Sequence, residues 1–212
     1  YDTLELVKKY DFMYGALGIH PDCVYDLTDA DYKWIEEHIN DDKIVAVGEI
    51  GLDYYREYDK DVQKEAFIRQ MEIARRNNKP IVVHSRDAAQ DTYDIMKEYH
   101  AEELGGVVHC FSYPMEMAER FMDMGFYIGI GGVVTFKNSK KLQEVAKAMP
   151  LERLVLETDC PYLAPDPHRG ERNDSSYISY VADKIAELRG ISTQELVDIT
   201  TANAKRMYRI ED

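Results

Sequence analysis

The chain has 212 residues, of which 45% are hydrophobic and 31% are charged, a composition typical of one soluble globular domain. No stretch approaches the roughly 18 consecutive apolar residues of a membrane helix. Residues 1–10 are amphipathic and charged, unlike a secretory signal. The net charge of -14 excludes a protein that coats DNA by neutralising many phosphates, although bound cations could still support chemistry on phosphodiesters. The three cysteines, Cys23, Cys110 and Cys160, are too scattered for a disulfide framework, which predicts a reducing, cytoplasmic location.

Short apolar runs rich in Val and Ile alternate along the chain with longer amphipathic stretches. The runs are residues 14–19, 44–50, 81–84, 106–110, 126–130 and 154–157. Apolar residues recur at helical spacing in the stretches 29–39, 61–77, 87–99, 115–124, 139–149, 176–189 and 193–208. Thr28 with Asp31, and Ser192 with Glu195, predict capping boxes at two helix starts. The alternation predicts an α/β fold in which parallel strands are joined by crossover helices.

Two α/β architectures fit this alternation, an open doubly wound sheet and a closed (β/α) barrel. No Gly-rich phosphate loop follows the first apolar run, which argues against the open sheet. Polar residues instead follow several different strands, as the active site of a barrel requires. We therefore expect a TIM-like (β/α) barrel that occupies residues 1–212 as a single domain.

Four ionisable residues stand at the carboxyl ends of four predicted strands. They are Glu49, His84, His109 and Asp159. A lone His or carboxylate at such a position more often makes a structural hydrogen bond or caps a helix. Four strands that end in this way are hard to explain by packing, because buried charges need a partner or a metal. Two imidazoles and two carboxylates at one mouth predict a site for divalent cations such as Zn²⁺ or Mn²⁺.

Other polar residues near the strand ends leave alternatives open. His20 either ligates a metal or binds a phosphate. Arg86 either holds a phosphate or pairs with Asp87 or Glu49. Asp53 either shapes the mouth of the site or begins a loop.

We interpret Glu157 differently from Asp159 and leave open that it faces outward, toward a helix.

Several motifs together resemble the TatD family of metal-dependent deoxyribonucleases, within the amidohydrolase-type TIM barrels. They are GIHP at 18–21, VGEIGLDY at 47–54, IVVHSRD at 81–87, VHCF at 108–111, YIGIGG at 127–132, LETDCPYL at 156–163 and NAKR at 203–206. The resemblance spans essentially all 212 residues in the order of the family, and the combination of motifs is highly specific although each alone is not.

The resemblance implies a set of roles. Glu49 would bridge two divalent ions (Mg²⁺, Mn²⁺ or Zn²⁺), with His84 and His109 on one ion and Asp159 on the other. His20 would lie close to the metals and the substrate phosphate. The expected activity is hydrolysis of phosphodiester bonds in DNA, with Glu49 and Asp159 as catalytic residues. Because the chain is acidic, we expect DNA to be held weakly and trimmed from an end.

Two departures from the family pattern concern the ends of the chain. Family members usually open with a strand that carries His-x-His, and this sequence has none. Six strands are visible, whereas a closed barrel of this kind needs eight. We expect the first two strands and a helix, about 40 residues, to be missing, which would leave the first strand with an unpaired edge. The late Arg-Asn-Glu-Pro segment of the family is replaced here by RNDS at 172–175.

Two rival functions remain compatible with the motifs. The same metal cage in the same barrel would also suit the hydrolysis of a small ester, lactone or amide, since a fold does not determine its substrate. The missing strands also allow a catalytically inactive binding protein. The sequence leaves the oligomeric state open.

Overall fold

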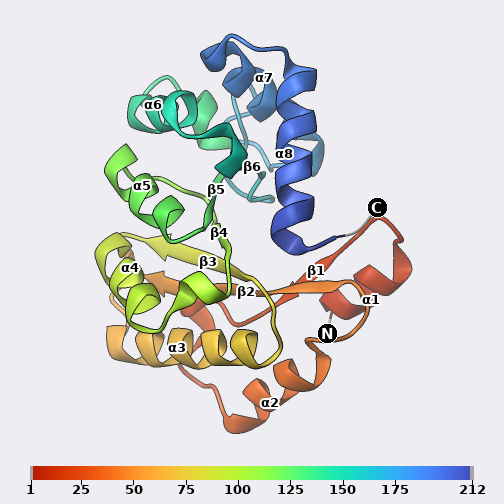
Figure 1. Cartoon of the computed structure of the whole chain (residues 1–212), viewed down its shortest axis with the longest axis vertical. Helices are drawn as coiled ribbons and strands as arrows, with labels where there is room; N and C mark the ends of the chain where they lie inside the picture. Colours follow the sequence, from red (N-terminus) through yellow and green to blue (C-terminus); the bar gives the residue numbers. More distant parts are fainter. Residues whose placement is uncertain (1, 211–212) are drawn as a thin grey trace. The chain divides into compact units, whose positions relative to one another are not determined.

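The computed structural model describes residues 2–210. The strands found in that range are β1 Gly15–Leu17, β2 Ile44–Asp53, β3 Ile81–Arg86, β4 Gly106–Val108, β5 Tyr127–Ile130 and β6 Leu154–Leu156. The α-helices are α1 Asp2–Lys9, α2 Asp29–His38, α3 Lys60–Arg76, α4 Ala89–Glu98, α5 Met115–Asp123, α6 Lys140–Ala148, α7 Ile178–Arg189 and α8 Thr193–Tyr208. Short 3₁₀ helices cover Pro21–Cys23, Ala101–Glu103, Gly132–Thr135, Leu151–Arg153 and Ser175–Tyr177. Strands and helices alternate along the chain (Figure 1).

The chain forms two compact units. Unit 1 comprises Tyr1–Val107 and Met207–Asp212, and unit 2 comprises Val108–Arg206. In unit 1, β1 pairs with β2 and β2 pairs with β3, both in parallel. The register places Gly51 opposite His84 and Asp53 opposite Arg86. Parallel pairing brings the carboxyl ends of β2 and β3, with Asp53 and Arg86, to the same edge, and Glu49 lies four residues before the end of β2.

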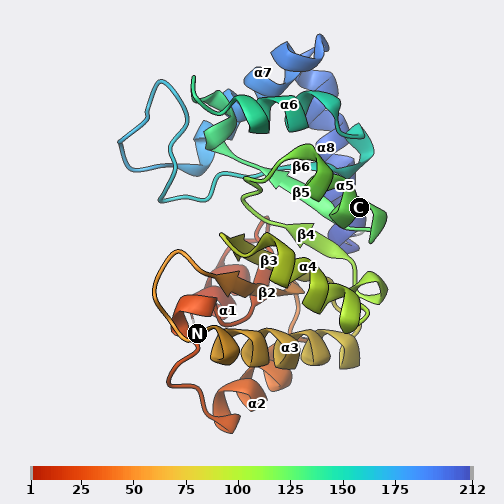
Figure 2. The ribbon, with the colours of Figure 1, turned by 90° about the vertical axis from the view of Figure 1, so that its left-hand side faces the viewer.

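Helix α3 is the main helix packed on the sheet of unit 1. Its first turn is capped by Asp59, whose carboxylate accepts hydrogen bonds from the backbone N–H groups of Asp61 and Val62. The apolar residues Phe67 and Met71 are fully buried along one face. Figure 2 shows α3 running alongside β2, against which it packs. The amphipathic pattern at 61–77 is therefore confirmed as a core-facing helix.

Two buried glutamines on α3 hold the backbone of the site. Gln63 accepts from the N–H of Asp53 at 2.8 Å and donates to its carbonyl oxygen at 3.0 Å. Gln70, two turns later, accepts from the N–H of Ile19 at 2.7 Å and donates to its carbonyl oxygen at 3.1 Å. Each amide satisfies both backbone groups of one residue, so α3 fixes the end of β2 and the segment that leads into His20.

In unit 2, β5 and β6 pair in parallel, with Ile128 opposite Leu154 and Ile130 opposite Leu156. Helices α6 and α7 pack on one another (Figure 1). Helix α7 ends at Gly190, whose φ of 68° is the left-handed conformation that glycine adopts at a helix C-terminus.

The side chain of Asn203, on α8, ties this helix to the start of β6. Its amide donates to the carbonyl oxygens of Leu151 and Leu154, both at 2.8 Å, and the residue is 2% exposed. Asn203→Ala should lower the free energy of unfolding by about 3 kcal/mol, because two buried carbonyls lose their donor. Urea denaturation measures this change. Asn40→Ala, at an exposed position, should cost less than about 0.5 kcal/mol, and equal costs at both positions would contradict this account.

The expected elements are confirmed with shifts at their ends, and three differences have local causes. Residues 2–9 form a helix that the sequence analysis did not predict, with Leu4 and Val7 buried. Strand β2 continues to Asp53, past the predicted end at residue 50. Strand β4 ends before Cys110, whose φ of 46° is left-handed and cannot continue a strand.

The two predicted caps are also present in the structure. The Asp31 carboxylate accepts from the backbone N–H and the hydroxyl of Thr28, and the Ser192 hydroxyl accepts from the N–H of Glu195. Among residues 2–210, no helix combines the length and apolarity needed to cross a membrane.

Candidate metal centre

The side chain of His84 lies between two carboxylates in unit 1. Its Nδ1 is 2.6 Å from Oε1 of Glu49, and its Nε2 is 3.0 Å from Oδ2 of Asp53. Nε2 of His20 is 3.4 Å from Nδ1 of His84 and 3.8 Å from Oε1 of Glu49. We call His20, Glu49, Asp53 and His84 the His84 cluster. The structure thus brings Glu49, His84 and His20 together in this unit, and their roles stay predictions.

Two glycines let β2 approach its neighbours closely enough to form this cluster. A Cβ at Gly51 would lie 2.0 Å from the backbone oxygen of His84, and one at Gly48 would lie 2.5 Å from Cβ of Val82. Since real Cβ atoms do not come so close, both positions require glycine. They lie on either side of Glu49 and allow its backbone to approach β3 closely.

The imidazole of His20 has a defined proton position. Its Nδ1 accepts from the backbone N–H of Asp22 at 3.1 Å, so the neutral ring carries its proton on Nε2, which faces Glu49 and His84. Burial, and next the neighbouring His84, lower the pKa of His20 below its ordinary value. His20 is therefore uncharged at neutral pH and is suited to donate a hydrogen bond to an anionic group.

Asp53 belongs to the His84 cluster, although its sequence position left open whether it shapes the site or begins a loop. It is 3% exposed, and besides His84 it accepts the backbone N–H of Tyr55 at 2.9 Å. The signal that could have identified it is the apolar pattern of β2, which continues through the buried Ile50 and Leu52. Asp53 is thus the last inward-facing residue of a strand and is not the start of a loop.

Arg86 is exposed and its guanidinium lies 3.8 Å above the ring of Tyr55. The ion pairs of Glu49 among the described residues include those with His20 and His84. The contact of Arg86 with the ring of Tyr55 favours the phosphate-binding alternative. A guanidinium stacked on an exposed phenol ring keeps its N–H groups directed outward, where an anion can reach them.

A second imidazole lies between two carboxylates in unit 2. Nδ1 of His109 is 3.0 Å from Oε2 of Glu157, and its Nε2 is 3.5 Å from Oδ1 of Asp159. Oε1 of Glu157 also accepts the backbone N–H of Cys110 at 2.7 Å. We call His109, Cys110, Glu157 and Asp159 the His109 cluster. The predicted ligands His109 and Asp159 are thus brought together in this unit.

The outward-facing alternative for Glu157 is wrong. Its side chain is 15% exposed and turns back over β5 to reach His109. Gly129 makes this possible, since a Cβ there would lie 2.3 Å from Oε2 of Glu157. Regular strand structure stops at Leu156, where β6 ends. Residues 157–159 are irregular, so both carboxylates can approach the same imidazole.

The donor set of each cluster suits a divalent cation. Ligand atoms of His20, Asp53 and His84 lie within 4.8 Å of one another, as do those of His109, Cys110 and Glu157. A neutral imidazole has one N–H, so it can donate to only one of two flanking carboxylates, and its other nitrogen offers a lone pair. Imidazole nitrogens and carboxylate oxygens are ligands that divalent cations such as Zn²⁺ take. The residues present therefore fit a metal in both units.

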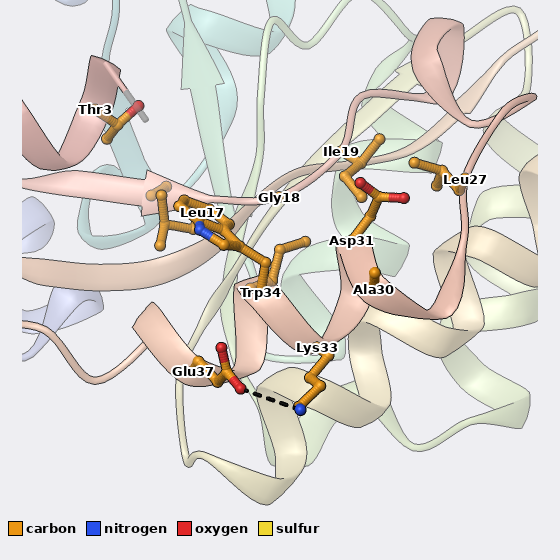
Figure 3. Close-up of a pocket in the computed structure, with 12 residues that line it drawn as sticks. Thr3, Leu17, Gly18, Ile19, Leu27, Ala30, Asp31, Lys33, Trp34 and Glu37 are labelled. Carbon is orange, nitrogen blue, oxygen red and sulfur yellow. Dashed lines mark ion pairs between the residues drawn. The ribbon is translucent and has the colours of Figure 1, made fainter.

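A cavity of about 610 Å³ between α1, β1 and α2 is a separate feature of unit 1. Figure 3 shows Leu17, Trp34 and the Lys33–Glu37 ion pair among its lining residues. Its carboxylates already have partners, since Asp31 caps α2 and Glu37 pairs with Lys33 at 3.5 Å. The described residues that line this cavity include no histidine, so the two His clusters remain the candidate centre.

Comparison with known proteins decides the family, since the sequence model of "TatD related DNase" matches residues 1–209. The chain belongs to the TatD family. It is 49% identical over 209 residues to the metal-dependent hydrolase YabD of Bacillus subtilis, covering 98% of this chain and 82% of YabD. It is 42% identical over 211 residues to the metal-dependent hydrolase YcfH of Escherichia coli K12, covering 98% of this chain and 78% of YcfH.

Solved structures agree with this assignment. The TatD homologue YjjV of Escherichia coli K12 superposes with a TM-score of 0.94 at 30% identity, over 99% of this chain and 82% of YjjV. An amidohydrolase of Saccharomyces cerevisiae, 19% identical, shares the fold with a TM-score of 0.80 over 97% of this chain and 84% of its own length. The α/β fold of the TIM-barrel class predicted from the sequence is thus confirmed. This TatD protein is a metal-dependent hydrolase.

Proposed function

We propose that this TatD protein hydrolyses phosphodiester bonds in DNA with the help of two divalent ions, trimming a weakly held strand from its end. The observation that carries the proposal is that each unit holds a histidine between two carboxylates, in a chain matched by the TatD related DNase family. The identity of the ions, Mg²⁺, Mn²⁺ or Zn²⁺, and a cytoplasmic location stay predictions. So does the single barrel domain over residues 1–212.

The metal ligands in this proposal are Glu49, His84, His109 and Asp159. Divalent ions bound by them would polarise phosphoryl oxygens and lower the pKa of water toward neutrality. The carboxylate of Asp159, whose side chain is 28% exposed, orients the attacking water and accepts its proton. His20 donates its Nε2–H to a phosphate oxygen, which its uncharged state and its fixed tautomer permit.

Arg86 holds the scissile phosphate. Its guanidinium lies on β3 two residues beyond His84, on the same side of the strand. Stacking on Tyr55 orients the guanidinium without consuming its hydrogen-bond donors. Because the net charge of -14 repels a polyanion, DNA is expected to be held only through local contacts such as that of Arg86.

Arg86→Lys should reduce kcat/KM on DNA by about 10- to 100-fold, because a lysine keeps the charge but loses the bidentate geometry. Bound metal should stay at the wild-type level, since the Arg86 guanidinium stacks on the ring of Tyr55, which is not a predicted ligand. Steady-state kinetics on a labelled oligonucleotide, with elemental analysis of the same sample, measures both. Arg56→Lys, a second exposed arginine of unit 1, is the matched control. Full activity of Arg86→Lys would remove Arg86 from substrate binding.

The function itself is tested on the purified protein in three steps. Elemental analysis gives the metal content, a chelator removes the metal, and each cation is added back separately. The reloaded protein is then assayed on oligonucleotides labelled at either end and on a panel of lactones and small esters. Stepwise shortening from one end supports the proposal, whereas turnover of the lactones or esters alone identifies the rival hydrolase. Absence of metal and of any turnover would identify a binding protein.

A further inference from the structure

We propose that Tyr55 forms a nucleobase subsite beside the His84 cluster. One base of the DNA strand stacks on the face of the Tyr55 ring that Arg86 leaves open. The inference rests on the proposed function, because it adds a contact with a base next to the phosphate that Arg86 holds. It does not depend on the identity or the number of the bound ions.

Tyr55 carries an exposed ring on a backbone that is held at several points. The residue is 63% exposed. Its N–H donates to Oδ1 of Asp53 at 2.9 Å, and the N–H of Tyr54 donates to the carbonyl oxygen of Arg86 at 2.8 Å. Gln63 in turn binds both backbone groups of Asp53. A ring on a fixed backbone loses little further freedom when a ligand binds, which favours a role in recognition.

The surroundings of the Tyr55 ring distinguish it from an ordinary exposed tyrosine. The neighbouring Tyr54 is engaged within the protein, since its hydroxyl donates to Asp91 at 2.8 Å and the ammonium of Lys60 lies 4.1 Å from its ring centroid. The Tyr55 ring instead has the guanidinium of Arg86 over one face, 3.8 Å from the centroid. The exposed area of Tyr55 therefore belongs largely to the opposite face and the edge of the ring.

Tyr55 and Arg86 lie together beside the predicted metal ligands of unit 1. Each follows a residue of the His84 cluster by two positions, Tyr55 after Asp53 and Arg86 after His84. The register of β2 and β3 places Asp53 opposite Arg86. Nε2 of His84 is 3.0 Å from Oδ2 of Asp53. The stacked pair thus stands at the edge of the cluster where the phosphate is proposed to bind.

The spacing of base, phenol ring and guanidinium suits a DNA strand. Stacked bases lie about 3.4 Å apart, so a base on the open face of Tyr55 would be about 7 Å, or two stacking steps, from the guanidinium carbon of Arg86. A base on Tyr55 and a phosphate on Arg86 can therefore belong to the same nucleotide or to neighbouring ones.

Stacking on Tyr55 would supply affinity that the charge of the chain does not. The net charge of -14 opposes the phosphate backbone, whereas stacking of a base on an uncharged ring needs no positive surface. Every base has a π-face, so a contact of this kind accepts any sequence. A hydrolase that trims a strand one nucleotide after another needs this tolerance.

The alternative role for Tyr55 is only to orient the guanidinium of Arg86. The two roles differ in the effect of removing a base from the DNA. If Tyr55 stacks on a base, an abasic residue at that position should weaken binding to the wild type by about 10- to 100-fold, and to Tyr55→Leu by less than about twofold. If Tyr55 only orients Arg86, the abasic residue should affect both proteins equally.

The experiment measures binding to hydrolysis-resistant phosphorothioate oligonucleotides in which one abasic residue is moved along the strand. The metal-loaded wild type is compared with Tyr55→Leu, with Tyr55→Phe, which keeps both ring faces, and with Tyr14→Leu. Tyr14 is the matched control, a 46% exposed tyrosine of unit 1 that precedes the amino end of β1, whereas Tyr55 follows the carboxyl end of β2. A fluorescent adenine analogue at the sensitive position, whose emission falls when it stacks, reports the contact directly. Values of kcat/KM are measured with ordinary oligonucleotides.

We expect one position at which the abasic residue weakens binding to the wild type, Tyr55→Phe and Tyr14→Leu but not to Tyr55→Leu. The fluorescence change should be lost in Tyr55→Leu alone. Equal sensitivity of the wild type and Tyr55→Leu at every position overturns the inference. So does a wild type that binds every abasic strand as well as the intact one, even if Tyr55→Leu does not fold.

Failure of the proposed function gives a different result. A wild type that shows the dependence on Tyr55 and the base but hydrolyses no DNA contradicts the proposed function alone. Hydrolysis of DNA without this dependence contradicts the inference alone, and absence of both binding and hydrolysis contradicts the two together.

Discussion

Glu49→Gln is expected to abolish almost all turnover, by about 10³-fold or more, which corresponds to a barrier higher by about 4 kcal/mol. A neutral amide cannot share negative charge between two cations, so both ions should be lost together. The melting temperature of the metal-free protein should stay the same or rise. Glu49 and Asp53 both approach the imidazole of His84, and removing one negative charge relieves their mutual repulsion.

Bound metal, hydrolysis rate and melting temperature are measured on one preparation. A purely structural Glu49 makes the opposite forecast, because the variant would then lose stability and keep its chemistry. Glu36→Gln is the matched control, since Glu36 is a surface carboxylate of unit 1 that pairs with Arg76. Retained metal stoichiometry with a near wild-type rate would end the two-metal hypothesis.

Gly51→Ala is expected to destabilise the protein by about 4 kcal/mol or more, a loss reserved for severe steric conflicts. Gly51 has a φ of +141°, which residues with a side chain rarely adopt. The added Cβ would lie 2.0 Å from the backbone oxygen of His84. Strands β2 and β3 would have to separate at the pair that positions His84, so metal binding should be lost along with stability.

Gly105→Ala distinguishes the two causes of this loss, the steric conflict of the added Cβ and the unfavourable positive φ. Gly105 also has a left-handed φ, +68°, but no atom lies within 4 Å of its ideal Cβ position. That variant carries only the backbone cost of about 1 kcal/mol. Chemical denaturation of both variants, with metal titration of the folded fractions, measures the difference. Similar losses at Gly51 and Gly105 would show that the close approach of β2 to β3 contributes nothing.

The sequence was sufficient for the fold because its strands and helices differ in hydrophobic period. The run at 81–84 and the stretch at 193–208 correspond closely to β3 and α8. Helix α1 was not predicted, since only Leu4 and Val7 of its eight residues are buried. The extension of β2 was missed because Gly51 and Asp53 resemble loop residues, and their fit depends on β3 and α3.

The site was predictable where a single strand end carries the signal. Glu49, His84 and His109 directly follow an apolar run, and Asp159 follows one after two intervening residues, so position alone makes them candidates. Asp53 and Glu157 were not predicted to join the two clusters, because their contacts are with residues 31 and 48 positions away. The outward interpretation of Glu157 treated this residue as part of a strand, whereas β6 ends one residue earlier, at Leu156. That all four predicted ligands serve one pair of ions stays a prediction.

The two glutamines of α3 make the geometry of the His84 cluster depend on the integrity of one helix. Gln63 supports Asp53, and Gln70 supports Ile19, the residue before His20. Because both amides project from one helix, an opening of α3 would release the backbone of Asp53 and the segment that leads into His20 in a single event. The two segments of the site therefore share one opening equilibrium, and any substitution that loosens the middle of α3 acts on both at once.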